Sequence, residues 1–185
     1  MKKVQREELL DLQTYDRERE RIRPAAMAAK DQRRIHVGPH LTFLFENRET
    51  IRYQVHEMMR AERLFREAEI THELDTYNEL LGGPGELGCS LLIEIADPQD
   101  RDQKLRRWVK LLDHLYARLP DGRRVPCTFD PRQVGEDRLS SVQYLRFDVK
   151  GVAPASIGCD HPDISAETVL EPAQRQALAQ DLADA

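Results

Sequence analysis

The sequence predicts an α+β fold in a single domain, residues 1–185, with a mainly antiparallel sheet of about five strands packed by amphipathic helices. Three observations predict this class. The hydrophobic repeat changes from a period of 3.6 residues to a period of 2 after Gly38-Pro39. Helices and strands then follow one another without regular βαβ alternation, and the first two expected strands form a hairpin. A chain of this length buries about 70% of its unfolded surface, so its core needs neither a disulfide nor a metal.

The first expected segment, residues 1–37, is helical. We expect a short helix at residues 7–12 and a longer one at residues 14–34, where Thr14 is placed to cap the first turn. Pro24 lies inside the longer helix. It either kinks this helix or begins a new one at its first position, where proline needs no N–H group.

The expected α+β core, residues 38–160, begins with a β-hairpin. Residues 41–45 and 51–55 alternate apolar and polar side chains, and a polar turn joins them. A helix is expected at residues 55–68, and its apolar stripe also carries Glu62. Residues 71–86 are rich in turn residues and lack the strand and helix that flank a phosphate loop, so we expect a connection there.

The second half of the chain predicts three more strands and two helices. The strands are expected at residues 87–95, 125–129 and 141–149. Asp97-Pro98 begins a helix whose apolar stripe continues to Leu119. The final segment, residues 161–185, is expected to be helical, with a cap at Ser165 and a restart at Pro172.

Composition excludes several classes of protein. The apolar runs are far shorter than the roughly 20 residues of a membrane span, and no signal-peptide core follows Met1, so we expect a cytoplasmic protein. Cys89, Cys127 and Cys159 are widely spaced and are expected to be free thiols. Residues 17–34 are basic, but they contain no aromatic residue to stack on bases, so nucleic-acid binding is not expected. We expect this helix to be solvated, with its positive face against the acidic C-terminal end.

One possible site combines carboxylates with a histidine. Glu62 on an apolar stripe needs a partner, because an unpaired buried charge costs several kcal/mol. It is either part of a structural ion pair or a general acid/base, with Glu57 and His161 as further catalytic candidates. Glu62, Asp160 and His161 are also candidate ligands of a divalent metal, iron or zinc, although a protein without a cofactor is the preferred interpretation.

A second possible site lies on the polar face of the expected sheet. Arg52, Glu94 and Arg146 are placed opposite the apolar alternation, and Arg60 follows on the next helix. If this face is open to solvent, these groups form ordinary surface ion pairs. If a helix covers it, they line a polar cleft that binds an anionic small molecule.

Several blocks of sequence resemble those of one bacterial family, and they occur in the same order along the chain. They are Phe45-Glu46-Asn47, residues 54–63, residues 73–78, residues 140–147 and Asp160-His161-Pro162. Together they resemble the bacterial domain of unknown function numbered 3501. The resemblance implies a redox or stress-related setting, beside rubrerythrin-like proteins and iron–sulfur oxidoreductases. His56 stands where glutamine is common in that family, which argues against a ligand role for His56.

Two functions follow as expectations. The first is a non-catalytic accessory or ligand-binding protein of a redox or stress-related system, because no complete nucleophile, metal or nucleotide motif is present. The alternative is a small enzyme, metal-dependent or metal-free, that uses Glu57 and Glu62 with Asp160 and His161 on an anionic small molecule. A homodimer formed through a sheet edge or the long helices is a third, structural possibility.

Overall fold

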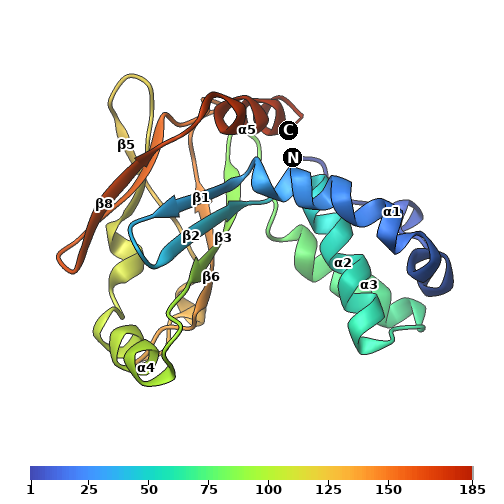
Figure 1. Ribbon diagram of the computed structural model, residues 1–185. Helices are drawn as coiled ribbons and strands as arrows, with labels where there is room; N and C mark the ends of the chain where they lie inside the picture. The colour runs from blue at the N-terminus through green and yellow to red at the C-terminus, as the bar shows by residue number, and fades with distance from the viewer. Residues whose placement is uncertain (185) are drawn as a thin grey trace.

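The computed structural model describes residues 1–184 and shows two antiparallel sheets beside a group of helices (Figure 1). One sheet has the strand order β1-β2-β3-β6 and the other β5-β4-β7-β8, and each strand pairing is antiparallel. The strands are β1 (Arg34–Val37), β2 (Leu41–Phe45), β3 (Leu87–Ile93), β4 (Leu115–Arg118), β5 (Arg124–Pro126), β6 (Val142–Phe147), β7 (Ser156–His161) and β8 (Ile164–Val169). The predicted α+β class is therefore confirmed, with eight strands where about five were expected.

The two sheets enclose the larger hydrophobic core. Inward-facing side chains of both sheets meet there, including Phe43, Phe147 and Ile157, which are fully buried. Two helices close this core, α4 (Pro98–Arg107) and α5 (Pro172–Ala183), which lie at opposite ends of the sheets (Figure 1). Each begins with a proline, where the missing N–H is not needed.

Three further helices form a separate unit beside the sheets. They are α1 (Leu12–Asp31), α2 (Arg48–Glu62) and α3 (Glu67–Asn78). Ile51, Val55 and Met59 recur at intervals of four on α2, which places them on one face, and they pack with Ile70 and Leu74 of α3 in a second hydrophobic core. The helical unit stands at the right of the sheets in Figure 1. No helix in the described part of the chain is long and apolar enough to cross a membrane.

Charged groups join the helical unit to the sheets. Arg33, just after α1, is buried and donates to both carboxylate oxygens of Asp181 on α5, at 2.7 and 2.8 Å. Asn47, at the start of α2, donates to the same carboxylate at 3.2 Å. Asp181 thus connects both cores. This is the one place where the basic N-terminal region meets the acidic C-terminal end by an ion pair among residues 1–184.

The free edge of β6 carries partners other than a strand. The main-chain N–H and C=O of Arg146 both bond Thr128, at 2.8 Å. Tyr144 uses its N–H and C=O in the same way, but its partner is the side-chain amide of Gln133, also at 2.8 Å. The amide of Gln133 therefore occupies the place of a neighbouring strand.

The predicted hairpin is wrong in its second arm. Residues 51–55 belong to α2, and β2 pairs instead with β1 through the turn at Gly38, whose φ of +60° suits glycine. Asn47 accepts from the N–H of Thr50, and the Thr50 hydroxyl accepts from the N–H of Asn47, so the helix begins at Arg48. The residues read as a turn are thus a helix cap.

Other segments also differ from the prediction. Residues 34–37, expected to be helical, form β1 because they pair with β2. Residues 71–86 were expected to be a connection, but α3 runs to Asn78. The helix from Pro98 ends at Arg107, and residues 115–118 form β4 because they pair with β7. Ser165 does not cap a helix; it lies in β8, which pairs with β7, so the segment 161–185 is helical only from Pro172. Pro24 is accommodated inside α1 without ending it.

Candidate functional site

A surface pocket lies where the end of α3 meets the edge of β6. Its volume is about 500 Å³, within the range of small-molecule sites. The lining residues come from three places: the end of α3, β3 with β6, and the segment after β5. They are Glu79, Leu80, Cys89, Thr128, Phe129, Asp130, Gln133, Tyr144, Leu145 and Arg146. We call this the β6 pocket.

Arg146 is the cation of the β6 pocket. It alternates with buried Leu145 and Phe147 along β6, so its side chain leaves the core side of the sheet. One guanidinium nitrogen donates to the main-chain carbonyl of Glu79 at 2.7 Å. No carboxylate of residues 1–184 forms an ion pair with Arg146, so its remaining donors face the pocket without an anion.

The other polar groups of the β6 pocket are largely engaged. Asp130 accepts hydrogen bonds from the guanidinium and from the main-chain N–H of Arg132, which hold the pKa of this carboxyl at about 2. Gln133 is bonded to the main chain of Tyr144. Tyr144, two residues before Arg146 on β6, is 47% exposed. The pocket therefore offers one unpaired guanidinium beside an aromatic surface.

A buried carboxylate lies behind this region of the sheet. Glu46, between β2 and α2, is 7% exposed. Its two oxygens accept from the hydroxyls of Thr50 and Ser90, at 2.6 and 2.7 Å. Two hydroxyl donors satisfy the oxygens without a bonded cation, so Glu46 fixes the start of α2 on β3.

Glu57, predicted to be catalytic, lies between two helices. It accepts from both Nε and Nη2 of Arg19 on α1, at 2.8 Å each, and from the hydroxyl of Tyr15 at 2.6 Å. The bond from Arg19, opposed by burial, lowers the pKa of Glu57 to about 2. A carboxylate with this pKa is a poor general acid or base near neutral pH, and its contacts hold α1 on α2.

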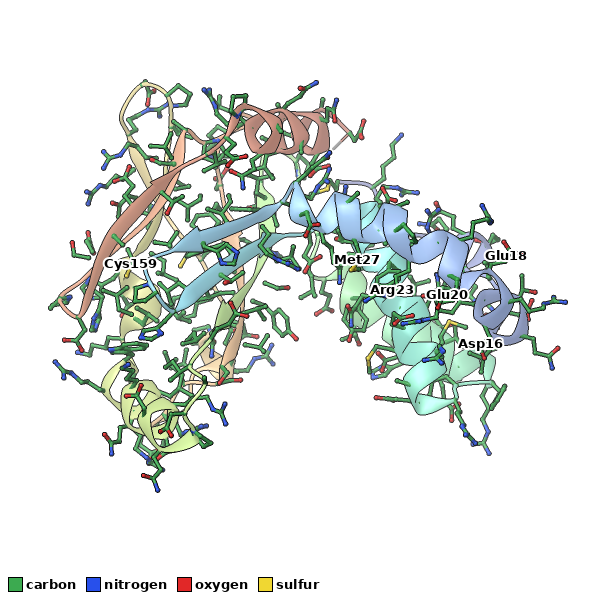
Figure 2. The ribbon with its side chains drawn as sticks, in the orientation of Figure 1. Asp16, Glu18, Glu20, Arg23, Met27 and Cys159 are labelled. Atoms are coloured by element: carbon green, nitrogen blue, oxygen red, sulfur yellow. The ribbon has the colours of Figure 1, made fainter. Side chains whose placement is uncertain are left out.

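Glu62 and Arg60 lie at the exposed end of α2. The expectation that Glu62 is buried is wrong: the apolar stripe of α2 is Ile51, Val55 and Met59, and Glu62 faces solvent. Arg60 donates to Asp16 of α1 at 2.8 Å. Asp16 lies in the half of α1 that is remote from the sheets (Figure 2).

Asp160 and His161 lie at the end of β7, on the other side of the molecule. Cys159, which directly precedes them, is seen among the strands in Figure 2. Asp160 bonds Nδ1 of His114 at 2.9 Å and Arg124 at 3.1 Å. Nδ1 of His161 accepts from the N–H of Asp163 at 3.2 Å, and burial lowers the pKa of His161.

The structure thus does not gather the predicted carboxylate and histidine set. Glu57 and Glu62 lie on α2 of the helical unit, whereas Asp160 and His161 lie on β7, in the sheet of order β5-β4-β7-β8. Across residues 1–184, no group of three or more His, Cys, Asp or Glu side chains has the geometry to hold a metal ion.

The predicted anion-binding residues are also distributed. Arg52 lies on α2, not on a strand, and lines a second pocket of about 330 Å³ between α1 and α2. Glu94 follows β3 and accepts a short hydrogen bond from Thr42, whose hydroxyl also meets Nδ1 of His36 at 2.8 Å. Among Arg52, Arg60, Glu94 and Arg146, only Arg146 lines the β6 pocket.

Sequence reasoning missed most of the β6 pocket. Thr128, Phe129 and Gln133 follow a short strand and were not singled out, because nothing in their spacing indicates that the chain folds back along β6. Tyr144 could have been noticed, since it alternates with Arg146 on the same face.

Cys89, Cys127 and Cys159 are free cysteines, and all three are buried. Burial raises the pKa of Cys127 to about 12 and of Cys159 to about 11, and it also raises the pKa of Cys89 well above its ordinary value. A thiol that is buried and protonated is a poor nucleophile. Chemistry at these sulfur atoms is therefore not supported by their surroundings.

The fold and the β6 pocket define a single-domain α+β protein with a small surface pocket next to a helical unit. Comparison places it further: residues 3–182 match the family described as Protein of unknown function (DUF3501), and the chain belongs to this family. It is similar to a solved crystal structure described as a novel protein of unknown function from Burkholderia pseudomallei K96243. That structure is 32% identical with a TM-score of 0.89, and the match covers 98% of this chain and 100% of that one. No curated protein matches the sequence at a significant level.

Proposed function

We propose that this protein binds a small anionic molecule in the β6 pocket without transforming it. The observation that carries the proposal is Arg146, a guanidinium that lines a pocket of about 500 Å³ and has no carboxylate partner within residues 1–184. A guanidinium presents two parallel N–H donors, which match the two oxygens of a carboxylate or phosphate. Tyr144 supplies an exposed aromatic surface for the remainder of the ligand.

The charges around Arg146 limit the ligand. Glu79 and Asp130 also line the pocket, although Arg132 neutralises Asp130. A ligand with several negative charges would approach the carboxylate of Glu79 as well as Arg146. We therefore propose a ligand with one anionic group and an uncharged or cationic remainder.

Removal of the Arg146 side chain tests this proposal. We expect Arg146→Ala to weaken the binding of a small carboxylate about tenfold or more, because a charge-assisted hydrogen bond contributes roughly 1.5–3 kcal/mol. A thermal-shift screen of the wild-type protein with acetate, lactate, glycine, citrate and inorganic phosphate identifies the probe, and calorimetry then measures its affinity for both proteins.

Arg123→Ala is the matched control, because Arg123 is an exposed arginine that pairs with Asp121 away from the pocket. Its affinity for the probe is expected to equal that of the wild type. Equal affinity in Arg146→Ala and wild type, or binding of none of the five compounds, would overturn the proposal.

We further propose that the protein acts as an accessory in a redox or stress-related system, the setting that the family resemblance implies. The buried thiols support a role through binding, since none of the three cysteines within residues 1–184 is placed for thiol exchange. Pull-down with a rubrerythrin-like protein and with an iron–sulfur oxidoreductase tests this role. Association at micromolar concentration is expected, and its absence both with and without the anion that the thermal-shift screen identifies would contradict the accessory role.

A further inference from the structure

Glu79 is a second charged residue of the β6 pocket that has no ion pair. It caps the C-terminal end of α3 and is exposed. Arg146 bonds the main-chain carbonyl of Glu79 at 2.7 Å, but within residues 1–184 the Glu79 carboxylate accepts no hydrogen bond and forms no ion pair. Asp130, the remaining charged residue of the lining, is paired with Arg132. The β6 pocket therefore has one unpaired carboxylate and one unpaired guanidinium.

These two unpaired charges are close to each other in the fold. The Glu79 carboxylate is attached, through a short flexible side chain, to the residue whose carbonyl Arg146 contacts. Its charge also contributes, after the bonded Asp130, to the raised pKa of Arg132, so it faces the segment after β5 that lines the same pocket. A ligand with a cationic and an anionic group on one carbon can thus meet both unpaired charges.

The C-terminal end of α3 adds to the negative potential around Glu79. The last carbonyls of a helix carry partial negative charge, which favours a cation nearby. The last turn of α3 contains no basic residue. Arg146 reaches this end from β6 and bonds it through one guanidinium nitrogen. The surroundings of Glu79 therefore favour a further positive group, such as the ammonium of a ligand.

We infer that the β6 pocket binds an α-amino acid with an apolar or aromatic side chain. The carboxylate of the amino acid bonds Arg146, and its ammonium group bonds Glu79. The two charges of the ligand then balance the two unpaired charges of the pocket. The side chain of the amino acid packs on Leu80, Phe129 and Tyr144, the apolar part of the lining. This inference rests on the proposed function and names the ligand class.

Three related compounds test which groups of the ligand are recognised. L-Phenylalanine has the carboxylate, the ammonium and an aromatic side chain, whereas 3-phenylpropionate lacks the ammonium and phenethylamine lacks the carboxylate. Calorimetry with the full-length protein at pH 7.5 measures each affinity. We expect L-phenylalanine to bind about fivefold more tightly than 3-phenylpropionate, because its ammonium adds one partly exposed ion pair. Phenethylamine that binds as tightly as L-phenylalanine would overturn the inference.

Glu79→Gln removes the charge of this side chain and keeps its shape. Its affinity for L-phenylalanine should fall about fivefold, whereas its affinity for 3-phenylpropionate should be unchanged or higher, because a repulsive carboxylate is lost. Glu69→Gln, in the first turn of α3, is the matched control and should bind L-phenylalanine like the wild type. Arg146→Ala should weaken the binding of both compounds.

The outcomes separate this inference from the proposed function. If L-phenylalanine binds no more tightly than 3-phenylpropionate, and Glu79→Gln changes neither affinity, the amino-acid inference is overturned. Weaker binding of 3-phenylpropionate by Arg146→Ala would in that case leave the proposed function standing. The inference is overturned in the same way if the wild type binds neither compound but binds one of the screened compounds through Arg146. Equal affinities of Arg146→Ala and wild type for every compound would contradict both.

Discussion

His56 is a buried histidine whose surroundings disfavour its protonated form. It lies on α2, is 3% exposed, and stacks on Tyr15 with ring centres 4.5 Å apart. Its Nε2 accepts from the main-chain N–H of Leu10 at 2.8 Å. Burial is the largest of the effects that lower its pKa, from the ordinary 6.5 to about 4. The folded protein therefore holds His56 neutral, in a position that ties the N-terminal segment to α2.

We expect His56 to make the protein less stable as the pH falls below 6.5. Above pH 6.5 both folded and unfolded chains carry a neutral imidazole, so the full stabilisation is present. Between pH 6.5 and 4 the unfolded chain binds the proton first, and the free energy of unfolding falls by about 1.4 kcal/mol per pH unit. Urea denaturation at pH 7.5 and 5.0 should show a loss of roughly 2 kcal/mol from this residue.

His56→Gln removes the titrating group but keeps an acceptor for Leu10. Its free energy of unfolding should change less between pH 7.5 and 5.0 than that of the wild type. His72→Gln, at an exposed position on α3, should follow the wild type. If His56→Gln and wild type lose the same free energy over this range, the titration of His56 does not govern acid stability.

The individual charges were the hardest features to predict. The alternation of apolar and polar residues correctly predicted that Arg146 lies on a strand with its side chain outside the core. A repeat of two residues determines directly which face of the sheet each side chain occupies. Glu62 was wrongly predicted to be buried, because its burial depends on where α2 ends. Arg63 adopts a left-handed backbone with φ of +53° and ends the helix, so Glu62 falls on the last, exposed turn.

At the scale of the elements, segments with a mixed pattern account for the errors. Ile51, Tyr53 and Val55 alternate as in a strand, yet Ile51, Val55 and Met59 also repeat every four residues as in a helix. The hydrogen bonds between Asn47 and Thr50 stabilise the start of a helix here. A cap of this kind could have been recognised in the sequence.

Residues 115–118 could not have been assigned from local pattern. They continue the apolar stripe of the preceding helix, but they form a strand because they pair with β7. Their partner, Ser156–His161, is about forty residues away, and its own strand character was not predicted. Long-range pairing of this kind overrides local propensity. By contrast β3 and β6, with clear alternation, were predicted correctly.

At the scale of the whole molecule, two hydrophobic cores are joined through buried charge. One core lies between the sheets and the other within the helical unit. Arg33 and Asp181 lie between them with side chains only 7% and 6% exposed. Coupling between the two parts of the protein therefore depends on an ion pair that cannot lose one partner without leaving the other buried and unpaired.

Asp181→Ala should destabilise the protein by about 3–5 kcal/mol, because it leaves the Arg33 guanidinium buried without its anion. The double variant Arg33→Met, Asp181→Leu should recover most of this loss, since neither charge remains. Glu67→Ala breaks a more exposed pair with Arg6 and should cost under about 1 kcal/mol. Urea denaturation measures all three. A double variant no more stable than Asp181→Ala would show that packing, not the unpaired charge, accounts for the loss.

The side-chain amide of Gln133 has a consequence for how copies of this protein can associate. An open sheet edge recruits a second chain by main-chain hydrogen bonding, whatever the sequence of that chain. On β6 the N–H and C=O groups of Tyr144 and Arg146 are already used within the chain. Association along this edge would first require the hydrogen bonds of Gln133 and Thr128 to β6 to break. A dimer that uses this face must therefore recognise its partner through side chains, and so with sequence specificity.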